Sequence, residues 1–135
     1  MVKSIFVNLP VKDLKKSVEF FTKLGFAFNP KFTDGNAACM IMGKNIFSML
    51  IVHKFFKTFI KKEISNAKKT TEVLLALQVN SKKEVDEMIA KAIKAGGKDT
   101  EKTQDYGWMY GRDFEDLDGH IWEAFYMDEK AMPKK

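Results

Sequence analysis

Cysteine, histidine and arginine are nearly absent from this chain of 135 residues. Cys39 is the only cysteine, so no disulfide can form within the chain, which fits a reducing, cytoplasmic location. His53 and His120 are the only histidines, and this excludes a three-histidine zinc site and any Cys/His finger. Arg112 is the only arginine among 23 basic residues, whereas nucleic-acid readers favour arginine for its two-pronged hydrogen bonding. The net charge of +5 therefore indicates a solvated lysine-rich surface and not a nucleic-acid partner.

Long hydrophobic runs are also missing. No apolar stretch approaches the length that crosses a bilayer, and the lysine-containing start leads into a strand pattern, not into the core of a signal peptide. We therefore expect no membrane partner. The composition, 45% hydrophobic and 30% charged, is that of a globular protein, and the length suits a single domain, 1–135, with a substantial core.

The first half of the chain predicts one strand, one helix and three further strands. The first strand covers residues 5–9, and Asp13 is a suitable first residue for the helix. Gly25 ends the helix. The helix carries an apolar stripe at helical spacing, made of Leu14, Val18, Phe21 and Leu24. The other strands are expected at about 26–33, 37–43 and 46–52, with hairpin-type turns at Asp34-Gly35-Asn36 and Gly43-Lys44-Asn45.

The second half repeats this order. A strand is expected over 72–79, and Ser81 with Glu84 forms a capping box at the start of a helix that ends at Gly96-Gly97. Strands near 97–101, 107–114 and 120–127 follow. The chain thus predicts two βαβββ modules, about 4–52 and 71–127, each of which must cover an apolar sheet face.

The linker between the modules is "KFFKTFIKKEI", residues 54–64. Phenylalanines at helical spacing among lysines predict a short amphipathic helix. A flap packed on the core is the favoured interpretation, and a lid over a pocket or a helix that faces a partner is the alternative.

Two motifs, "VKDLKKSVEFFTKLGF" near the start and "DLDGHIWEAF" near the end, give the chain its family resemblance. The tandem modules with these motifs resemble the vicinal oxygen chelate superfamily, which includes glyoxalase I, bleomycin-resistance proteins, fosfomycin-resistance transferases and extradiol dioxygenases. The family usually has proline where this chain has Leu117. The resemblance implies an α+β fold in which two tandem βαβββ modules form a curled mixed sheet around a cleft, and it implies a homodimer.

In the metal-using members of that superfamily, histidines on the first strand of each module and glutamates on last strands bind a divalent ion. Phe6 and Leu74 occupy the histidine positions in this chain, and neither can bind a metal. Glu123 alone matches. Because a divalent site needs at least three good protein donors, we expect no metal and no other cofactor.

Glu123 is the candidate catalytic residue. It shares a strand face with Ile121 and Phe125, and the resemblance makes that face the cleft. A buried carboxylate without a partner is costly, so Glu123 is either paired within the structure or serves as a base or acceptor for a ligand.

Candidate ligand-binding residues lie on or beside the expected cleft face. Arg112 follows two aromatic residues and could hold an anionic or planar ligand, although an ion pair with Asp113 or Glu115 is the alternative. The full set is Asn8, Gln78, Trp108, Tyr110 and Arg112. We regard Cys39 as a buried, inert thiol and both histidines as turn or surface residues.

Three functions remain compatible with the sequence. The favoured one is a protein that binds a small molecule in its cleft without the family's metal, for example by sequestering a drug. The alternative is an enzyme of the glyoxalase (lactoylglutathione lyase) type that uses Glu123 with atypical metal ligands or in metal-free acid–base chemistry. The third is a dimeric interaction module without a ligand. A fold alone does not decide between them.

Overall fold

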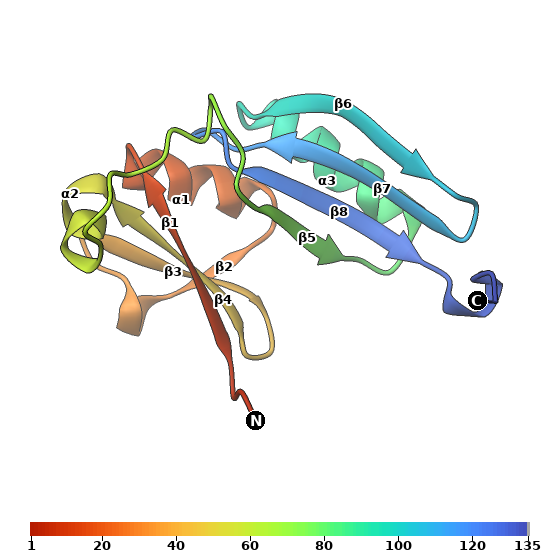
Figure 1. The fold of residues 1–135 in the computed structure, drawn as a ribbon, viewed down its shortest axis with the longest axis horizontal. Coiled ribbons are helices and arrows are strands. Elements are labelled where there is room, and N and C mark those ends of the chain that lie inside the picture. The colour runs from red at the N-terminus through yellow and green to blue at the C-terminus, as the bar shows by residue number, and fades with distance from the viewer. Residues whose placement is uncertain (135) are drawn as a thin grey trace. The chain divides into compact units, whose positions relative to one another are not determined.

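The computed structural model describes residues 1–134 and divides into two compact units, Met1–Asn66 and Ala67–Lys135. Each unit contains one βαβββ module with a four-stranded mixed sheet (Figure 1). The longest helix has 13 residues. Over the described part of the chain, no helix combines the length and apolar character needed to cross a membrane.

In the first unit the sheet order is β1-β4-β3-β2, with β1 parallel to β4 and the other neighbours antiparallel. The elements are β1 (Ile5–Val11), α1 (Leu14–Lys23), β2 (Ala27–Asn29), the 3-10 turn η1 (Pro30–Phe32), β3 (Ala37–Gly43), β4 (Ile46–Val52), α2 (His53–Phe56) and the 3-10 turn η2 (Lys57–Phe59).

The second unit repeats this topology with the order β5-β8-β7-β6, and β5 is parallel to β8. Its elements are β5 (Leu74–Gln78), α3 (Lys82–Lys94), β6 (Lys98–Asp105), β7 (Met109–Glu115), β8 (Ile121–Met127) and the 3-10 turn η3 (Glu129–Ala131). The predicted α+β class and the tandem βαβββ modules are confirmed.

The two main helices begin and end in the same way. The side chains of Asp13 and Ser81 accept hydrogen bonds from amides three residues later, each at 3.1 Å. Glu84 completes the second cap by accepting the amide of the residue before Ser81 at 2.8 Å. Gly25 and Gly96 end the helices with φ of +104° and +109°, a conformation that glycine adopts without steric cost. The duplication therefore extends to the local chemistry of the helix ends.

Three predicted elements differ from the structure. The strand expected near 97–101 continues as β6 to Asp105. The strand expected over 26–33 stops at Asn29, because Pro30 starts η1 and Asn29 caps it by accepting the Lys31 amide. The turn at 34–36 therefore follows η1 and does not join two paired strands directly. The linker helix expected over 54–64 is confined to residues 53–59, and Ile60 is already extended.

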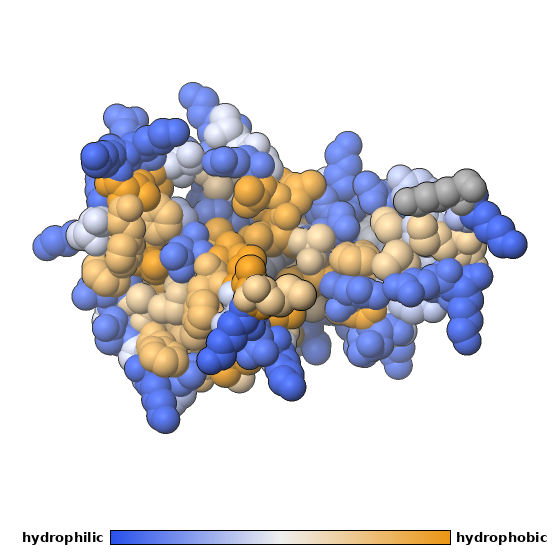
Figure 2. Space-filling view, turned by 60° about the horizontal axis from the view of Figure 1, so that its bottom comes forward, coloured by the Kyte–Doolittle hydropathy of each residue, from blue (hydrophilic) through white to orange (hydrophobic). Residues whose placement is uncertain are grey.

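The core of the first unit lies between α1 and one face of its sheet. Phe20 and Phe21 of α1 are buried with Val11 and Leu50 of the strands. Phe6 lies on the opposite face and stacks on Phe47 of β4, with ring centroids 4.6 Å apart, yet remains 47% exposed. Figure 2 shows hydrophobic side chains reaching the surface of this unit, on the left of the view.

The core of the second unit lies between α3 and its sheet. Trp122 and Phe114 of the strands are fully buried, as are Val85, Ile89 and Ala92 of the helix. Burying side chains of this size stabilises the unit by about 1.5–3 kcal/mol each. In Figure 1, α3 lies behind the sheet formed by β5 to β8, which leaves the other side of this sheet to a second set of side chains.

Candidate functional site

Strand β8 divides its side chains between the two faces of the second sheet. Trp122 and Ala124 are buried on the side of α3. Glu123 and Phe125 point to the other side, because neighbouring residues of a strand alternate. We call this second side the carboxylate face. The prediction that Glu123 shares a face with Phe125 follows directly from this alternation.

Asp113 lies directly opposite Glu123 in the antiparallel pairing of β7 with β8. A hydrogen bond joins the two carboxyl groups. Burial raises the pKa of Glu123, and the negative charge of Asp113 and the hydrogen bond between them raise it further. Burial also raises the pKa of Asp113, although the hydrogen bond from Glu123 and the charge of Lys102 oppose that rise. The surroundings therefore favour the protonated form of both carboxyl groups, and for Glu123 burial, the charge of Asp113 and their hydrogen bond all act in that direction.

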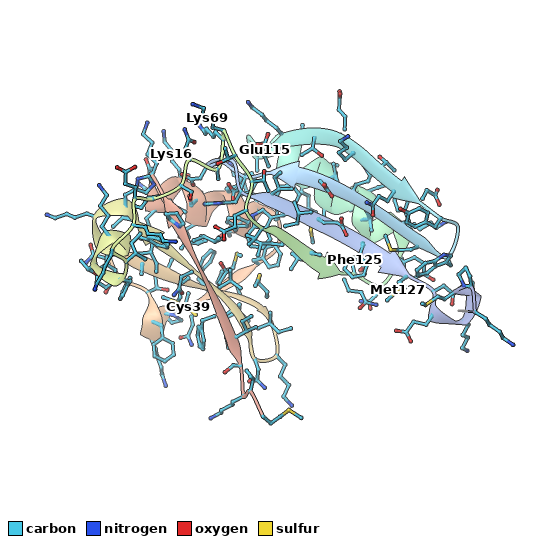
Figure 3. The ribbon with its side chains drawn as sticks, in the orientation of Figure 1. Lys16, Cys39, Lys69, Glu115, Phe125 and Met127 are labelled. Carbon is cyan, nitrogen blue, oxygen red and sulfur yellow. The ribbon has the colours of Figure 1, made fainter. Side chains whose placement is uncertain are left out.

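Gly111 lies beside this pair, where a side chain would be crowded. A Cβ atom at Gly111 would lie 3.3 Å from the Cβ of Phe125 and 3.7 Å from the carboxyl carbon of Glu123. Half-buried Met109 and Met127 lie opposite each other further along the same face. Phe125 and Met127 project from β8 in Figure 3. The pair thus lies among soft, apolar side chains that suit an adaptable contact with a small molecule.

Gln78 lies on the carboxylate face as well. It is exposed on β5 and lies opposite Phe125 in the parallel pairing of β5 with β8. The candidate Asn8 belongs to the first unit, where it is exposed and lies opposite Met49. Because Asn8 and Met49 correspond to Ala76 and Glu123 of the second module, Met49 marks the position equivalent to the glutamate. Only the second module carries an acid there.

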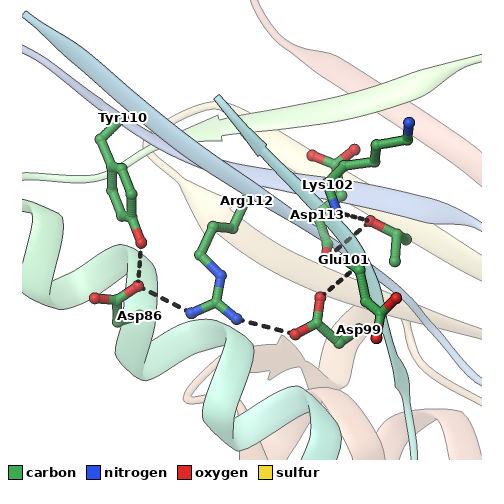
Figure 4. Close-up of polar contacts among 8 residues, drawn as sticks. Asp86, Asp99, Glu101, Lys102, Tyr110, Arg112 and Asp113 are labelled. Atoms are coloured by element: carbon green, nitrogen blue, oxygen red, sulfur yellow. Dashed lines mark hydrogen bonds and ion pairs between the residues drawn. The ribbon is translucent and has the colours of Figure 1, made fainter. Parts of the chain in front are cut away.

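Arg112 and Tyr110 lie on the α3 side of the sheet and not on the carboxylate face. Arg112 donates hydrogen bonds to Asp86 of α3 and to Asp99 of β6, each at 3.0 Å (Figure 4). Tyr110 donates a hydrogen bond to Asp86 at 2.6 Å. The hydrogen bonds from Tyr110 and from Arg112 both lower the pKa of Asp86. The expected ion pair of Arg112 with Asp113 or Glu115 is wrong, because those residues point to the other side. This network fastens α3 to the sheet.

The remaining sequence candidate, Trp108, precedes β7 and stacks on Tyr106 with ring centroids 6.4 Å apart. Its backbone carbonyl accepts the amide of Asp128 at 2.7 Å. The structure therefore places Trp108 at the end of the β7–β8 pair, where it orders the chain that leaves β8.

The turn before β8 is held by a buried carboxylate, Asp116, which is 6% exposed. It accepts the amides of Asp118 and His120 at 2.9 and 3.0 Å and the indole N–H of Trp122 at 2.9 Å. Burial raises the pKa of Asp116, while His120 and these donors oppose the rise. Asp116 thus fixes the start of β8, and with it the register that sets Glu123 opposite Asp113.

The residues present do not fit the divalent-metal centre that the family resemblance implies. Phe6 and Leu74 replace the histidine donors, and both side chains are about half exposed. Among residues 1–134, no group of three or more His, Cys, Asp or Glu side chains is arranged to hold a metal ion. Asp113 is the acid directly opposite Glu123, whereas Glu115, on the same strand face, lies opposite Ile121, so only two carboxyl groups are opposed and a divalent site needs three protein ligands.

The sequence reasoning missed Asp113 as the partner of Glu123. The signal was available, because counting outward from the turn over 116–119 pairs Glu115 with Ile121 and therefore Asp113 with Glu123. The partners of Arg112 could not be found this way, since Asp86 lies 26 residues away on a helix.

The fold and the site define an α+β protein of two βαβββ modules with a carboxyl pair on the second sheet. Residues 3–43 match a family described as bleomycin resistance protein-like, N-terminal. A hypothetical protein from S. aureus is 31% identical, with a TM-score of 0.79, and the alignment covers 93% of this chain and 94% of that one. The match over residues 3–43 and the shared fold relate the chain to proteins named for the glyoxalase/bleomycin resistance/dioxygenase family.

More distant structures share the fold. A glyoxalase-related enzyme from Fulvimarina pelagi has a TM-score of 0.77 at 20% identity, with 93% of this chain and 88% of that chain covered. A genomically encoded fosfomycin resistance protein from Listeria monocytogenes has a TM-score of 0.68 at 16% identity, with 96% and 98% covered. The search of curated proteins gave no significant match.

Proposed function

We propose that this protein binds a small organic molecule on the carboxylate face of its second sheet, without a stoichiometric divalent metal. The observation that carries the proposal is the pair of Asp113 and Glu123, two carboxyl groups directly opposite each other across β7 and β8 among half-buried apolar side chains. Such a pair costs stability, because like charges opposite each other on a sheet repel. Destabilising carboxyl pairs of this kind occur at functional sites, where a ligand forms hydrogen bonds with both carboxyl groups.

The surroundings of the pair suit such a ligand. The thioethers of Met109 and Met127 adapt to irregular shapes, and Gln78 adds an amide donor and acceptor on the same face. The names of the related proteins supply candidate ligands. Bleomycin and fosfomycin are therefore the first two probes.

The test is calorimetric titration of each probe into the wild type, Glu123→Gln and Glu115→Gln. Glu115 is the matched control, since it lies on the same strand face as Asp113 but opposite Ile121 and not opposite an acid. We expect binding to weaken by about tenfold or more in Glu123→Gln, the effect of one lost charged hydrogen bond, and to persist in Glu115→Gln. Equal affinities in all three proteins would contradict the proposal.

Metal content is tested separately by elemental analysis of protein purified without chelators. We expect far less than one Zn, Ni, Mn or Fe per chain. A full equivalent of metal that is lost in Glu123→Ala would show that the donor set is larger than the one described.

A second candidate function is metal-free acid–base catalysis of the glyoxalase type. The raised pKa values of Asp113 and Glu123 favour it, because a carboxyl group whose pKa is shifted upward towards the working pH is a better general acid or base. Conversion of the methylglyoxal–glutathione adduct to lactoylglutathione, measured without added metal, tests it. Activity in the wild type that is lost in both Glu123→Gln and Asp113→Asn would favour catalysis over binding alone.

A further inference from the structure

Residues 53–62, which form α2, η2 and the three positions after them, expose aromatic and aliphatic side chains. We call them the basic–aromatic segment. Phe55 and Phe59 contact each other edge to face, with ring centroids 4.9 Å apart. Phe59 is 60% exposed and Phe55 and Ile60 are each 36% exposed, and no residue of α2 or η2 is buried. The flap packed on the core that the sequence favoured is therefore wrong for Phe59.

The charges of this segment all have one sign. Lys54, Lys57, Lys61 and Lys62 are exposed around the two phenylalanines, and the segment contains no acidic residue. Consistent with this, none of the salt bridges within residues 1–134 involves these lysines. The segment thus combines a compact apolar tip with four lysines, and the nearest acidic residue in the sequence, Glu63, follows directly after it.

We propose that the basic–aromatic segment docks on an anionic lipid surface, with the rings of Phe55 and Phe59 in the interface and the lysines on the headgroups. A protein partner fits less well, because protein interfaces are depleted in lysine and enriched in arginine, and all four cations here are lysines. Lysines that flank exposed phenylalanines are typical of segments that lie in the plane of a membrane surface. The sequence argument against a membrane partner rested on the length of apolar runs, which applies only to spanning segments.

The size of the effect follows from the charge count. Each lysine near an anionic surface strengthens binding on the order of fivefold, so four of them together govern the affinity. The aromatic pair adds a term that does not depend on the lipid charge. Docking is therefore reversible and depends on salt, since screening weakens the lysine contribution.

The test is co-sedimentation with vesicles of phosphatidylcholine alone and of phosphatidylcholine mixed with an equal amount of phosphatidylglycerol. We expect the wild type to bind only the mixed vesicles. A variant with glutamine at all four lysines should lose this binding by about a hundredfold or more. Phe59→Ser, which keeps every charge, should weaken it by severalfold. Circular dichroism checks that each variant is folded.

The control variant replaces four other exposed lysines of the same unit, Lys15, Lys16, Lys23 and Lys44, with glutamine. It removes the same charge and should still bind. An equal loss in the control would mean that net charge alone is responsible and would overturn the proposal, as would absence of wild-type binding. An unchanged Phe59→Ser variant would overturn it too. Binding to immobilised polyglutamate without binding to vesicles would assign the segment to an acidic protein.

Discussion

Replacing Glu123 by glutamine should stabilise the protein at neutral pH. In the native protein two carboxyl groups face each other across β7 and β8, and folding raises the pKa of both above that in the unfolded chain. An amide at Glu123 removes the repulsion and can donate to the Asp113 carboxylate, a charged hydrogen bond of about 1–2 kcal/mol. For a chain of 135 residues this corresponds to a rise in Tm of about 3–8 °C.

The pH dependence has a definite sign. Because the folded pKa values of Asp113 and Glu123 are raised, the folded state binds more protons than the unfolded state, and stability falls as pH rises from about 4 through the folded pKa values. Glu123→Gln should flatten this fall. Asp113→Asn should do the same, and the double variant should add little, since either change alone removes the repulsion between the two carboxyl groups.

The assay is chemical denaturation from about pH 4 to neutral pH. It is followed by the fluorescence of Trp108 and Trp122, both of which lie in the second unit. Glu115→Gln is the control and should keep the wild-type slope. A Glu123→Gln variant that is less stable than the wild type at neutral pH, or one that keeps the full slope, would show that the two opposed carboxyl groups do not destabilise the folded state.

Four other outcomes are expected. Gly119→Ala should lower the free energy of unfolding by about 3–5 kcal/mol, because its φ is +89° and the new Cβ would lie 2.7 Å from the backbone nitrogen of Lys68. Gly107→Ala, with a φ of +81° and open space around the Cβ, should lower it by only about 1–2 kcal/mol. Equal losses in the two variants would refute the steric argument. Arg112→Ala should cost about 1–2 kcal/mol and Arg112→Lys less, by urea denaturation; a neutral Arg112→Ala would mean that the partly exposed network is fully screened. Burial raises the pKa of the Cys39 thiol, so Ellman's reagent should label it only after unfolding, and rapid labelling of the native protein would contradict this. Sedimentation at micromolar concentration should give twice the 15.5 kDa chain mass, and a monomer alone would refute the expected dimer.

The local sequence determined most of the fold. Asp13, Ser81, Gly25 and Gly96 begin and end the helices where the pattern predicted, because caps and left-handed glycines act over only a few residues. The duplicated βαβββ order could be predicted from the sequence for the same reason, since each module repeats the same short-range signals. The errors lie where local signals were weak, at Pro30 and after Phe59.

In the candidate site, too, local sequence patterns predicted some features and tertiary structure determined the others. Alternation along β8 placed Glu123 opposite in direction to Trp122 without any knowledge of the rest of the chain, because the period of a strand is two. The pairing of β7 with β8 was needed to identify Asp113 as the partner of Glu123. The packing of α3 on the sheet was needed to identify Asp86 as a partner of Arg112. Both contacts depend on how strands and helices meet across the sheet, which the composition of a single segment does not encode. The sequence therefore determined which side chains lie on the same face of a strand. The tertiary structure decided which of them contact each other as a carboxyl pair or an ion pair.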